Sequence, residues 1–530
     1  MNHTYSVPYS ENYFSKLFLD YVSNQNDLKS FIQYEPTIDS IAEAINNKSK
    51  EKINREVLVN VLRNQYANIE LSEATRRNID ALLEENTFTI TTGHQLGIFT
   101  AEWYFIYKII SCIKLADDAK LQHPNKHFVP VFWMATEDHD FAEINHIELA
   151  SHVFQWNKNT SGACGEIKTD GLSEIIKSLE VFLADRKYAT EIISKFKKAY
   201  SENTLAEATR VLVNDLFQSY GLVILDANDA ALKAEFKKIM IDDVTNHNAF
   251  HKVNESSKAL EQMGYSIQVN PREINFFYLD ENYRDRITKN GDKYETTDSK
   301  YHFTKEELLN IIETHPEKMS PNVILRPLYQ EMILPNLAYI GGPGEIAYWL
   351  QFKSMFEYYQ VNLPILTWRN SFMMLKESDL KKWEKQKFKA EELFDSINDL
   401  SVKYIERHSN KKLDLEEERK SLANEFEKIK AQLSNINEQL PYSLTGIEVR
   451  LSHMLDNLER KMLKHEKREH SEGLGVINNI KSKYFPKNKL QERKENFSMQ
   501  YAEQGARLLQ VIYDNTRLFD TAFKVIVISS

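Results

Sequence analysis

The sequence predicts an α/β protein in which a parallel-sheet core with inserted connecting segments is followed by an α-helical antiparallel coiled-coil arm. Two apolar runs in the first third of the chain each end in glycines or polar residues, the pattern of parallel strands that build a site at their carboxyl ends. A heptad pattern of apolar residues occupies much of the last third. Glycine (15) and proline (13) are scarce among the 530 residues, which favours long regular elements over a loop-rich all-β fold.

The core is expected to span residues 1–370 and to begin with helices over residues 1–86. Apolar runs at 87–90 and 129–135 are predicted strands, and residues 101–119 between them have the spacing of a helix. Strand, helix and strand at this separation form a βαβ unit, which implies a parallel pair with a right-handed crossover.

Two insertions are expected to interrupt this pattern, at about residues 147–200 and 240–310. The first combines a short strand-like piece with charged helices, and the second contains an alternating run and an Asn290-Gly291 turn typical of an antiparallel hairpin. The apolar runs at 221–226 and 363–368 are predicted to return to the sheet, the latter as its last strand.

Residues 371–482 are expected to form the coiled-coil arm. One heptad seam runs from Leu415 to Leu440 and a second from Leu444 to Met462, with Pro441 at the predicted turn. Exposed seams of this length usually find a partner, so we expect a homodimer that forms through the arm, although a solvated spacer is the alternative. The C-terminal segment, 483–530, is expected to dock on the core.

Composition excludes several classes of protein. The net charge of −10 disfavours nucleic-acid and anionic-membrane partners. Two cysteines, Cys112 and Cys164, cannot build a disulfide framework or a thiolate zinc site, and this usage fits a reducing compartment. No signal peptide is visible, and no apolar run reaches the length of a membrane span. We therefore expect a cytoplasmic protein.

The first candidate group follows the predicted strand at 87–90. A turn from strand to helix would direct backbone N–H groups and the helix dipole at one point, which suits a phosphate or carboxylate. Side chains here could donate to phosphate oxygens during group transfer. The alternative is that the glycines serve the turn's geometry alone and that a threonine caps the helix. The candidate residues are Thr92, Gly93, His94, Gln95 and Gly97.

The second group follows the apolar run at 129–135 and consists of Glu137, Asp138, His139 and Asp140, with Asn145 shortly after. Extended backbone would place Asp138 and Asp140 on one side and the other two on the opposite side. Proton transfer, metal binding and a purely structural role as caps remain alternative interpretations.

A third group lies late in the core. Arg326 suits a carboxylate or phosphate because its guanidinium carries a fixed fork of donors. A glycine-rich segment that predicts another strand-to-helix turn follows it, and the run at 221–226 ends in a further polar residue. The remaining candidates are Asp226, Gln330, Gly341, Gly342, Gly344 and Glu345. Neither a P-loop nor a G-x-G-x-x-G fingerprint is present.

Three long strings in this order carry a family resemblance: T-T-G-H-Q-L-G, V-P-V-F-W-M-A-T-E-D-H-D-F-A-E-I-N-H and R-P-L-Y-Q-E-M-I-L-P-N-L-A-Y-I-G-G-P-G-E. Over nearly its whole length the chain resembles the bacillithiol-biosynthesis cysteine-adding enzymes. The resemblance implies a Rossmann-like catalytic core, a C-terminal coiled coil, a dimer, and a ligase that joins L-cysteine to glucosaminyl-malate to form bacillithiol.

The family is similar to nucleotidylyl transferases, in which H-x-G-H follows the first strand. This chain has His94-Gln95-Leu96-Gly97 there, so the second histidine is missing and a standard ATP-dependent adenylation is not assured. We expect no metal and no tightly bound cofactor, with ATP or another nucleotide as the candidate cosubstrate. The alternative function is a non-catalytic dimeric coiled-coil protein whose α/β domain binds a nucleotide or sugar.

The hypothesis for the mechanism assigns the segment from Gly93 to Gly97, with His94 and Gln95, to the activating phosphate or the cysteine carboxylate. Asp138, His139 or Asp140 would orient the glucosamine amine and accept its proton, because an ammonium is not a nucleophile. Arg326 would bind the malate carboxylates, and residues 341–345 would complete the pocket floor.

Overall fold

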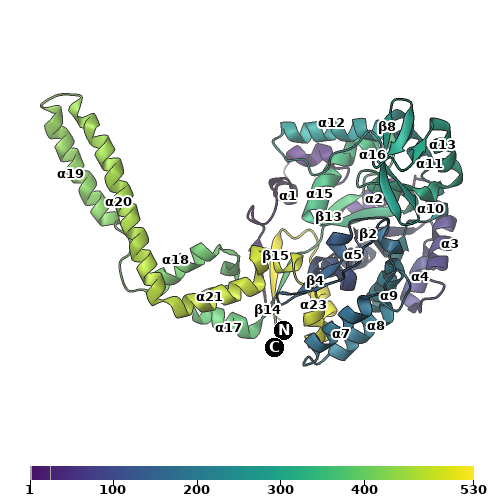
Figure 1. Cartoon of the computed structure of the whole chain (residues 1–530), viewed down its shortest axis with the longest axis horizontal. Helices are drawn as coiled ribbons and strands as arrows, with labels where there is room; N and C mark the ends of the chain where they lie inside the picture. Colours follow the sequence, from purple (N-terminus) through teal and green to yellow (C-terminus); the bar gives the residue numbers. More distant parts are fainter. Residues whose placement is uncertain (1–2, 24–25, 530) are drawn as a thin grey trace. The chain divides into compact units, whose positions relative to one another are not determined.

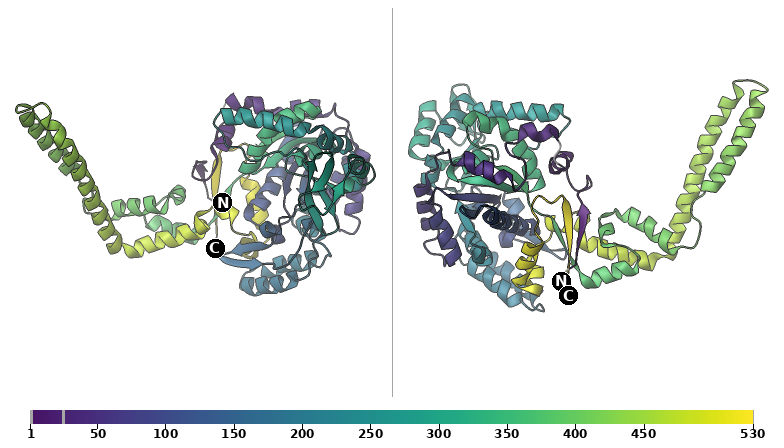
Figure 2. Two further views of the ribbon diagram at one scale, coloured as in Figure 1. Left: turned by 45° about the horizontal axis from the view of Figure 1, so that its top comes forward. Right: turned by 180° about the vertical axis from the view of Figure 1, so that it is seen from behind.

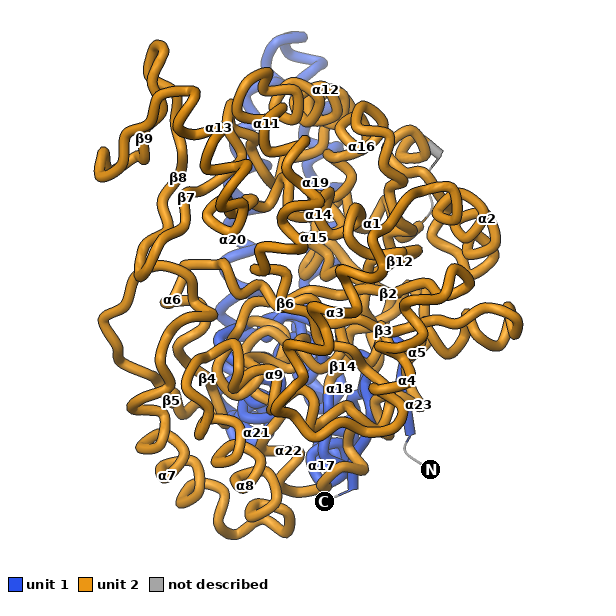
Figure 3. Tube along the Cα trace, turned by 90° about the vertical axis from the view of Figure 1, so that its right-hand side faces the viewer, with its two compact units in different colours: residues 1–6, 374–488, 525–530 blue, residues 7–373, 489–524 orange. Residues whose placement is uncertain are grey.

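The computed structural model describes residues 3–23 and 26–529, which divide into two compact units. Unit 1 consists of Met1–Ser6, Met374–Asn488 and Val525–Ser530, and unit 2 of Val7–Met373 and Lys489–Lys524 (Figure 3). Within the described part of the chain no helix is long and apolar enough to cross a membrane.

Unit 2 is built around a five-stranded sheet in the order β13-β12-β2-β3-β6, of which Figure 1 labels β13 and β2. Every neighbouring pair is parallel, which confirms the predicted α/β class. If the five strands are numbered in the order in which they occur in the chain, their order across the sheet is 5-4-1-2-3. This is the arrangement of a Rossmann-type sheet. The strands are β2 (Thr87–His94), β3 (His127–Met134), β6 (Val223–Asp226), β12 (Asn336–Gly341) and β13 (Ile365–Trp368).

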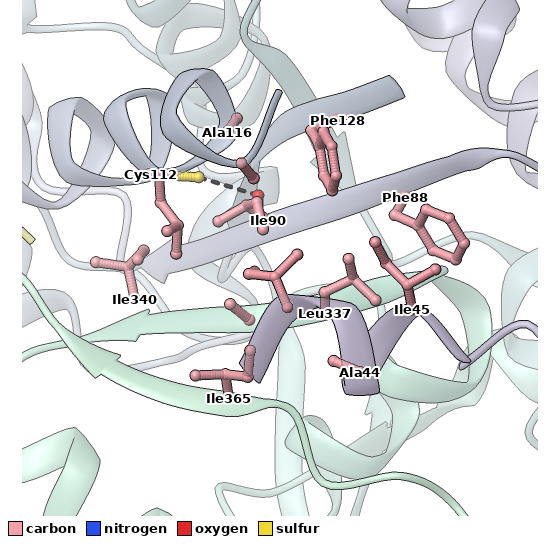
Figure 4. Close-up of a cluster of buried hydrophobic side chains, with 14 of the residues drawn as sticks. Ala44, Ile45, Phe88, Ile90, Cys112, Ala116, Phe128, Leu337, Ile340 and Ile365 are labelled. Atoms are coloured by element: carbon pink, nitrogen blue, oxygen red, sulfur yellow. Dashed lines mark hydrogen bonds between the residues drawn. The ribbon is translucent and has the colours of Figure 1, made fainter. Parts of the chain in front are cut away.

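Helices cover both faces of this sheet. Figure 4 shows Cys112 and Ala116 of α5 (Trp103–Gln122) on one side of β2, and Ala44 and Ile45 of α2 (Ser40–Lys48) on the other. Such two-sided burial explains why the strands are apolar along most of their length. The thiol of Cys112 donates to the carbonyl oxygen of Ile90 at 3.0 Å, and its burial raises the pKa of the thiol. Cys112 is therefore a small core residue and no nucleophile.

The N-terminal 86 residues are mainly helical, but one strand was not expected. The helices are α1 (Lys16–Val22), α2, α3 (Arg55–Gln65) and α4 (Glu73–Ala81). The strand is β1 (Thr4–Pro8), which pairs with β15 (Ala522–Ile528) in a sheet of order β1-β15-β14. Its partner lies about five hundred residues away in the sequence, so no local sequence pattern could predict the pairing.

The two insertions form the elements that were predicted, with more strands. The first contains a hairpin of β4 (His146–Leu149) and β5 (His152–Gln155) before its helices. The second contributes four strands to a five-stranded sheet, β10-β9-β8-β7-β11, whose last strand β11 follows the predicted bounds, and Asn290 pairs with Lys293 across the predicted turn. The strands of this sheet are β7 (Phe276–Asp280), β8 (Tyr283–Asn290), β9 (Lys293–Thr296), β10 (His302–Phe303) and β11 (Met319–Pro321).

The other helices of unit 2 connect these strands or cover them. They are α6 (Phe141–Ile144), α7 (Leu172–Leu183), α8 (Ala189–Ala199), α9 (Leu205–Phe217), α10 (Ala230–Ala234), α11 (Lys237–Asn246), α12 (Asn248–Gln262), α13 (Lys305–Thr314), α14 (Leu325–Ile333), α15 (Pro343–Trp349), α16 (Lys353–Tyr359), α22 (Ser498–Gln504) and α23 (Arg507–Asn515).

Unit 1 contains the predicted coiled-coil arm. In Figure 1 and in the right-hand view of Figure 2, α19 (Glu416–Ser434) and α20 (Leu440–Glu469) run side by side as a hairpin. The turn lies earlier than predicted, between Ser434 and Leu440, and Pro441 sits in the first turn of α20. Proline is tolerated there because the first turn of a helix lacks intrahelical partners for its N–H groups. The remaining elements are β14 (Phe372–Lys376), α17 (Glu377–Lys385), α18 (Ile397–His408) and α21 (Ser471–Tyr484).

Candidate functional site

The carboxyl ends of the parallel strands meet where the order of the sheet reverses. β2 is the first strand of the sheet in the chain; β3 and β6 follow on one side of it, and β12 and β13 on the other. The reversal therefore lies between β2 and β12, and in open parallel sheets ligands bind at such a point. His94 ends β2 and Gly341 ends β12, so the structure brings the first and third candidate groups to one edge.

The segment after β2 differs from the predicted glycine turn. Thr92, Gly93 and His94 belong to β2, where Gly93 pairs with Trp133 and His94 with Met134 of β3. Residues 95–102 then form a loop with one short 3-10 turn, Ile98–Thr100, before α5 begins, so the glycines do not direct the N-terminus of an α-helix at a ligand. The run of threonines favours continued strand, which explains the difference.

Gly97 has a packing role in this loop. A Cβ atom at Gly97 would lie 2.4 Å from the Cβ of Ala101. Ala101 has a φ of 50°, as part of three consecutive residues in the left-handed region. The interpretation that this glycine serves geometry is therefore the one that the structure supports.

His94 is an uncharged imidazole at the end of β2. Its ring centroid lies 5.1 Å from that of Tyr104 and 5.0 Å from that of Phe105. Burial, then the charge of Lys108, lowers the pKa of His94 to about 4. Its Nδ1 lies 2.8 Å from the carbonyl oxygen of Gln95 and so carries the proton, which leaves Nε2 as an acceptor. In this tautomer His94 cannot donate to a phosphate oxygen through Nε2, contrary to its predicted role.

Lys108 of α5 is a buried cation that sequence reasoning missed. Its ammonium donates to the carbonyl oxygen of Gly93 and lies 2.6 Å from Oε2 of Glu345. The lysine is 2% exposed, in a helix that is apolar on nearly every other side. A charged residue within the run Phe105 to Ile110 was the available signal, because buried lysines are almost always paired.

Glu345 is therefore committed to a network and does not form an open pocket floor. Its carboxylate accepts hydrogen bonds from Tyr339 Oη at 2.6 Å and from the backbone N–H of Gly342 at 2.7 Å. Burial acts to raise the pKa of Glu345, but Lys108 and these donors outweigh it and hold the pKa below its usual value. Gly341 ends β12, and a Cβ at Gly344 would meet open space.

Gln95 joins the first candidate group to the second. Its amide Nε2 donates to Asp138 Oδ2 at 2.6 Å and to Glu143 Oε2 at 2.7 Å. One neutral amide thus lies between two carboxylates that would otherwise repel each other. The ends of β2 and β3 are connected through these side chains.

The polar residues 137–140 follow β3 after Ala135 and Thr136, and they contact different partners. A turn at Thr136 and Glu137 interrupts the extended backbone that was expected. Glu137 pairs with the buried Lys233 at 2.5 Å. The Nδ1 of His139 accepts from Arg284 Nη1 at 2.7 Å. Asp140 caps α6 by accepting from the backbone N–H of Glu143 at 3.3 Å.

These partners divide the group by role. Asp140 acts as a helix cap, as the structural interpretation predicted, and Glu137 is neutralised. Burial, then the charge of Arg284, lowers the pKa of His139, so this ring is uncharged near neutral pH. Asp138 remains the carboxylate of the group with an atom directed toward the end of β2. No group of three or more His, Cys, Asp or Glu in the described ranges could hold a metal ion.

Arg326 carries an unsatisfied donor. Its Nη1 donates to Gln330 Oε1 at 3.0 Å, and its guanidinium lies 5.6 Å from the Trp133 ring and 5.7 Å from the Tyr339 ring. Its Nη2 is buried and, among the residues that the structure describes, has no hydrogen-bond partner of good geometry, although the Tyr348 hydroxyl lies close to the guanidinium. An orphaned guanidinium N–H is costly unless a ligand accepts from it. This is the arrangement expected of an anion-binding arginine.

Two candidates lie apart from the centre of the site. Asn145 is buried, and its Oδ1 lies 3.1 Å from Nδ1 of His146 at the start of β4. Asp226 ends β6, where its Oδ1 accepts from Thr136 Oγ1 at 2.5 Å. Asp226 also lines a polar cavity of about 530 Å³ at the β3–β6 end of the sheet edge.

Arg369, directly after β13, is a further buried charge that the prediction left out. Its guanidinium forms a two-bond pair with Glu492, with Nη2 to Oε1 at 2.8 Å and Nη1 to Oε2 at 2.9 Å. It also lies 5.3 Å from the ring of Tyr104, which contacts His94. Glu492 comes from the last part of unit 2, so sequence spacing gave no sign of this pair.

Comparison with known proteins places this site in a family. Residues 2–370 match the model described as bacillithiol biosynthesis BshC, N-terminal Rossmann-like domain, and residues 372–528 match the BshC C-terminal coiled-coil domain. The chain belongs to this family. Both matches confirm the resemblance and the fold class expected from the sequence.

Relatives match over almost their whole length. A protein of Flavobacterium psychrophilum is 42% identical over 518 residues, which is 97% of this chain and 97% of the relative. One of Flavobacterium johnsoniae is 40% identical over 519 residues, 97% and 98% of the two chains. One of Christiangramia forsetii is 39% identical over 531 residues, 99% of each. All three are named "Putative cysteine ligase BshC".

Proposed function

We propose that the chain is a ligase that joins L-cysteine to glucosaminyl-malate through an amide bond and so forms bacillithiol. The observation that carries this proposal is the buried, unsatisfied Nη2 of Arg326 near the carboxyl ends of the neighbouring strands β2 and β12. A guanidinium N–H in that state needs an anionic acceptor, and both substrates carry carboxylates. The names of the relatives agree with a cysteine substrate.

Amide formation requires that the cysteine carboxylate be activated. In the simplest route this carboxylate attacks a phosphate of ATP or another nucleotide, which gives an acyl-adenylate and pyrophosphate, or an acyl-phosphate and a nucleoside diphosphate. The amine then attacks the acyl carbon, and the phosphate group leaves. The end of β2 is the proposed place of the activated carboxyl group, with Arg326 Nη2 as its donor, because His94 Nε2 is an acceptor and Gln95 Nε2 already donates to Asp138 and Glu143.

Asp138 is the proposed base for the glucosamine amine. The amine must lose a proton before it can attack, and a carboxylate within hydrogen-bond reach can accept it. Asp138 fits this role better than its neighbours, because His139 is held by Arg284 and Asp140 caps α6. Gln95 fixes Asp138 by donating to Oδ2 and so aligns the base with the end of β2.

Mass spectrometry of the purified chain incubated with cysteine, glucosaminyl-malate and ATP tests this function, with parallel reactions that each omit one component. Bacillithiol together with AMP and pyrophosphate would establish adenylation, and ADP with phosphate would establish an acyl-phosphate. In cells, a deletion strain should lose bacillithiol and accumulate glucosaminyl-malate. Normal bacillithiol in a strain that carries alanine at both His94 and Asp138 would refute the site assignment.

We also propose that the chain acts as a homodimer through its arm. No residue of α19 is buried, and Ile447, Met454 and Leu458 of α20 are 47%, 66% and 47% exposed. Apolar residues that repeat on one face of a helix are costly to leave in water, and a second copy of the arm presents the same face.

A further inference from the structure

A polar cavity of about 530 Å³ opens at the β3–β6 end of the sheet edge, beside the site described above. Its volume falls within the range of about 300–1,000 Å³ typical of small-molecule sites. Such sites are mostly apolar, whereas side chains with amides and charges dominate this one. Its lining includes Asn64, Gln65, Asn68, Asn228, Lys168, Arg210, Glu166, Glu202, Glu207 and Asp226.

The charges of the lining favour a cationic ligand. Four carboxylates and two cations line the cavity, which leaves a formal charge of −2. Neither cation forms a close ion pair with a carboxylate in the described part of the chain, although Asp226 and Glu207 lie near enough to stabilise the charge of Arg210. Arg210 instead donates to Gln65 Oε1 at 2.8 Å and to the carbonyl oxygen of Ile224 at 3.3 Å.

Two carboxylates in the cavity, the half-buried Asp226 and the solvent-exposed Glu166, have oxygen atoms that accept no hydrogen bond from the described residues. Asp226 uses Oδ1 for both the Thr136 hydroxyl, at 2.5 Å, and the Asn228 backbone N–H, at 3.0 Å. No donor among the described residues reaches Oδ2 of Asp226, and none hydrogen-bonds to or pairs with the carboxylate of Glu166. Desolvation, then the charge of Asp226, raises the pKa of Glu166, so the two groups lie within electrostatic reach of each other.

The loop that carries Glu166 is fixed to the end of β3. The backbone N–H of Cys164 donates to the carbonyl oxygen of Asp138 at 2.6 Å, and that of Gly165 donates to Thr136 at 2.8 Å. A Cβ at Gly165 would lie 2.7 Å from the Cβ of Thr136, so only glycine permits this contact. Glu166 is thereby held on the cavity wall next to the turn that contains Asp138.

We propose that this cavity recognises the amino sugar of the acceptor substrate, with Glu166 and Asp226 binding its ammonium and the amides of Asn64 and Asn68 binding its hydroxyls. Amide side chains both donate and accept, as sugar hydroxyls do, and two unpaired carboxylates match one ammonium. This inference rests on the proposed function, which it deepens by assigning the place where the acceptor binds before its amine is deprotonated.

Calorimetric titration of the full chain with D-glucosamine and with D-glucose, at pH 6.5, tests the proposal. At this pH an aliphatic amine is protonated, and glucose replaces it by a neutral hydroxyl. We expect glucosamine to bind at least about tenfold more tightly than glucose, because hydrogen bonds to charged groups contribute more than neutral ones. Equal affinity for the two sugars, or no binding of either, would overturn the proposal.

Charge-removing variants locate the binding site. Glu166→Gln should reduce the preference for glucosamine about tenfold and leave glucose binding unchanged. The matched control is Glu174→Gln on α7, which removes an exposed carboxylate paired with Lys177 outside the cavity and should change neither affinity. An unchanged preference in Glu166→Gln, or Mg²⁺ binding that excludes glucosamine, would contradict the assignment.

The two proposals fail in different ways. If glucosamine binds as expected but no amide product forms in the complete reaction, the proposed function is wrong and the sugar site stands. If bacillithiol forms while Glu166→Gln changes neither glucosamine binding nor the KM for glucosaminyl-malate, the function stands and the sugar site is wrong.

Discussion

The Nζ atom of Lys108 lies 2.6 Å from Oε2 of Glu345 and joins α5 to the first turn of α15 at the carboxyl ends of β2 and β12. The same ammonium donates to the carbonyl oxygen of Gly93 in β2. One buried lysine thus ties together three elements that end at the candidate site, which makes it a positioning residue for that edge of the sheet.

Lys108→Met should destabilise the chain strongly. The change leaves the carboxylate of Glu345 without its cation, and breaking a buried pair in this way costs about 3–5 kcal/mol. We expect about 3 kcal/mol, the lower end, because a quarter of the Glu345 side chain is exposed. Urea denaturation measures the change. The double variant Lys108→Met, Glu345→Gln should recover part of the loss, and a single variant as stable as the parent would contradict the role of the pair.

Gln95→Leu should reduce activity more than stability. The amide of Gln95 separates the carboxylates of Asp138 and Glu143, and its removal leaves two like charges facing each other. Because hydrogen bonds to charged groups contribute about 1.5–3 kcal/mol, we expect at least about a tenfold fall in bacillithiol in a complemented deletion strain. Gln510→Leu, which removes an exposed amide paired with Asp514, is the control. Equal bacillithiol in the two strains would show that Gln95 does not position the base.

His94 should make the chain less stable in mild acid. Its pKa in the folded chain is about 4, below the ordinary value of 6.5, so the unfolded state binds more protons between these values. Stability from this group is therefore present above pH 6.5 and is lost as the pH falls toward 4, by at most about 3 kcal/mol. His94→Gln removes the titration. The free energy of unfolding of the parent should fall more steeply over this window than that of His94→Gln. Parallel curves would show that folding does not lower the pKa of His94.

The sequence was sufficient to predict the parallel sheet and the arm, because both rest on local periodicity. The strands at 87–90 and 129–135 and the heptads after Leu415 each repeat within a short window. The strand β1 was not predictable in this way, since its partner β15 lies at the other end of the chain.

The meeting of the candidate segments at one edge of the sheet was predicted, but the contacts among their side chains were not. Apolar runs that end in polar residues showed which segments meet at the carboxyl edge of the sheet. They could not show that Glu345 is paired with Lys108, or that Arg284 from the second insertion binds His139. Such pairs join segments more than a hundred residues apart, and only the folded chain brings them together.

Replacing Ile447, Met454 and Leu458 by Gln should convert a dimer into a monomer. These side chains recur at intervals of seven and four on one face of α20 and are at least 47% exposed. Each would contribute about 1.5–3 kcal/mol if a second arm buried it fully, so their combined loss should exceed what most dimers can tolerate. Sedimentation velocity measures the mass, and far-ultraviolet circular dichroism checks that α19 and α20 still form.

The control for this triple variant replaces Tyr442 and Val449, which are 78% and 51% exposed on a different side of α20. Tyr442 and Val449 are seven residues apart and so lie on one side of α20, and at about 100° per residue this side points away from Ile447. The double variant Tyr442→Gln, Val449→Gln should therefore remain dimeric. If both variants dissociate, the dimer does not depend on this particular face. If the parent is already a monomer at micromolar concentration, the exposed seam serves another purpose and the proposed dimer is wrong.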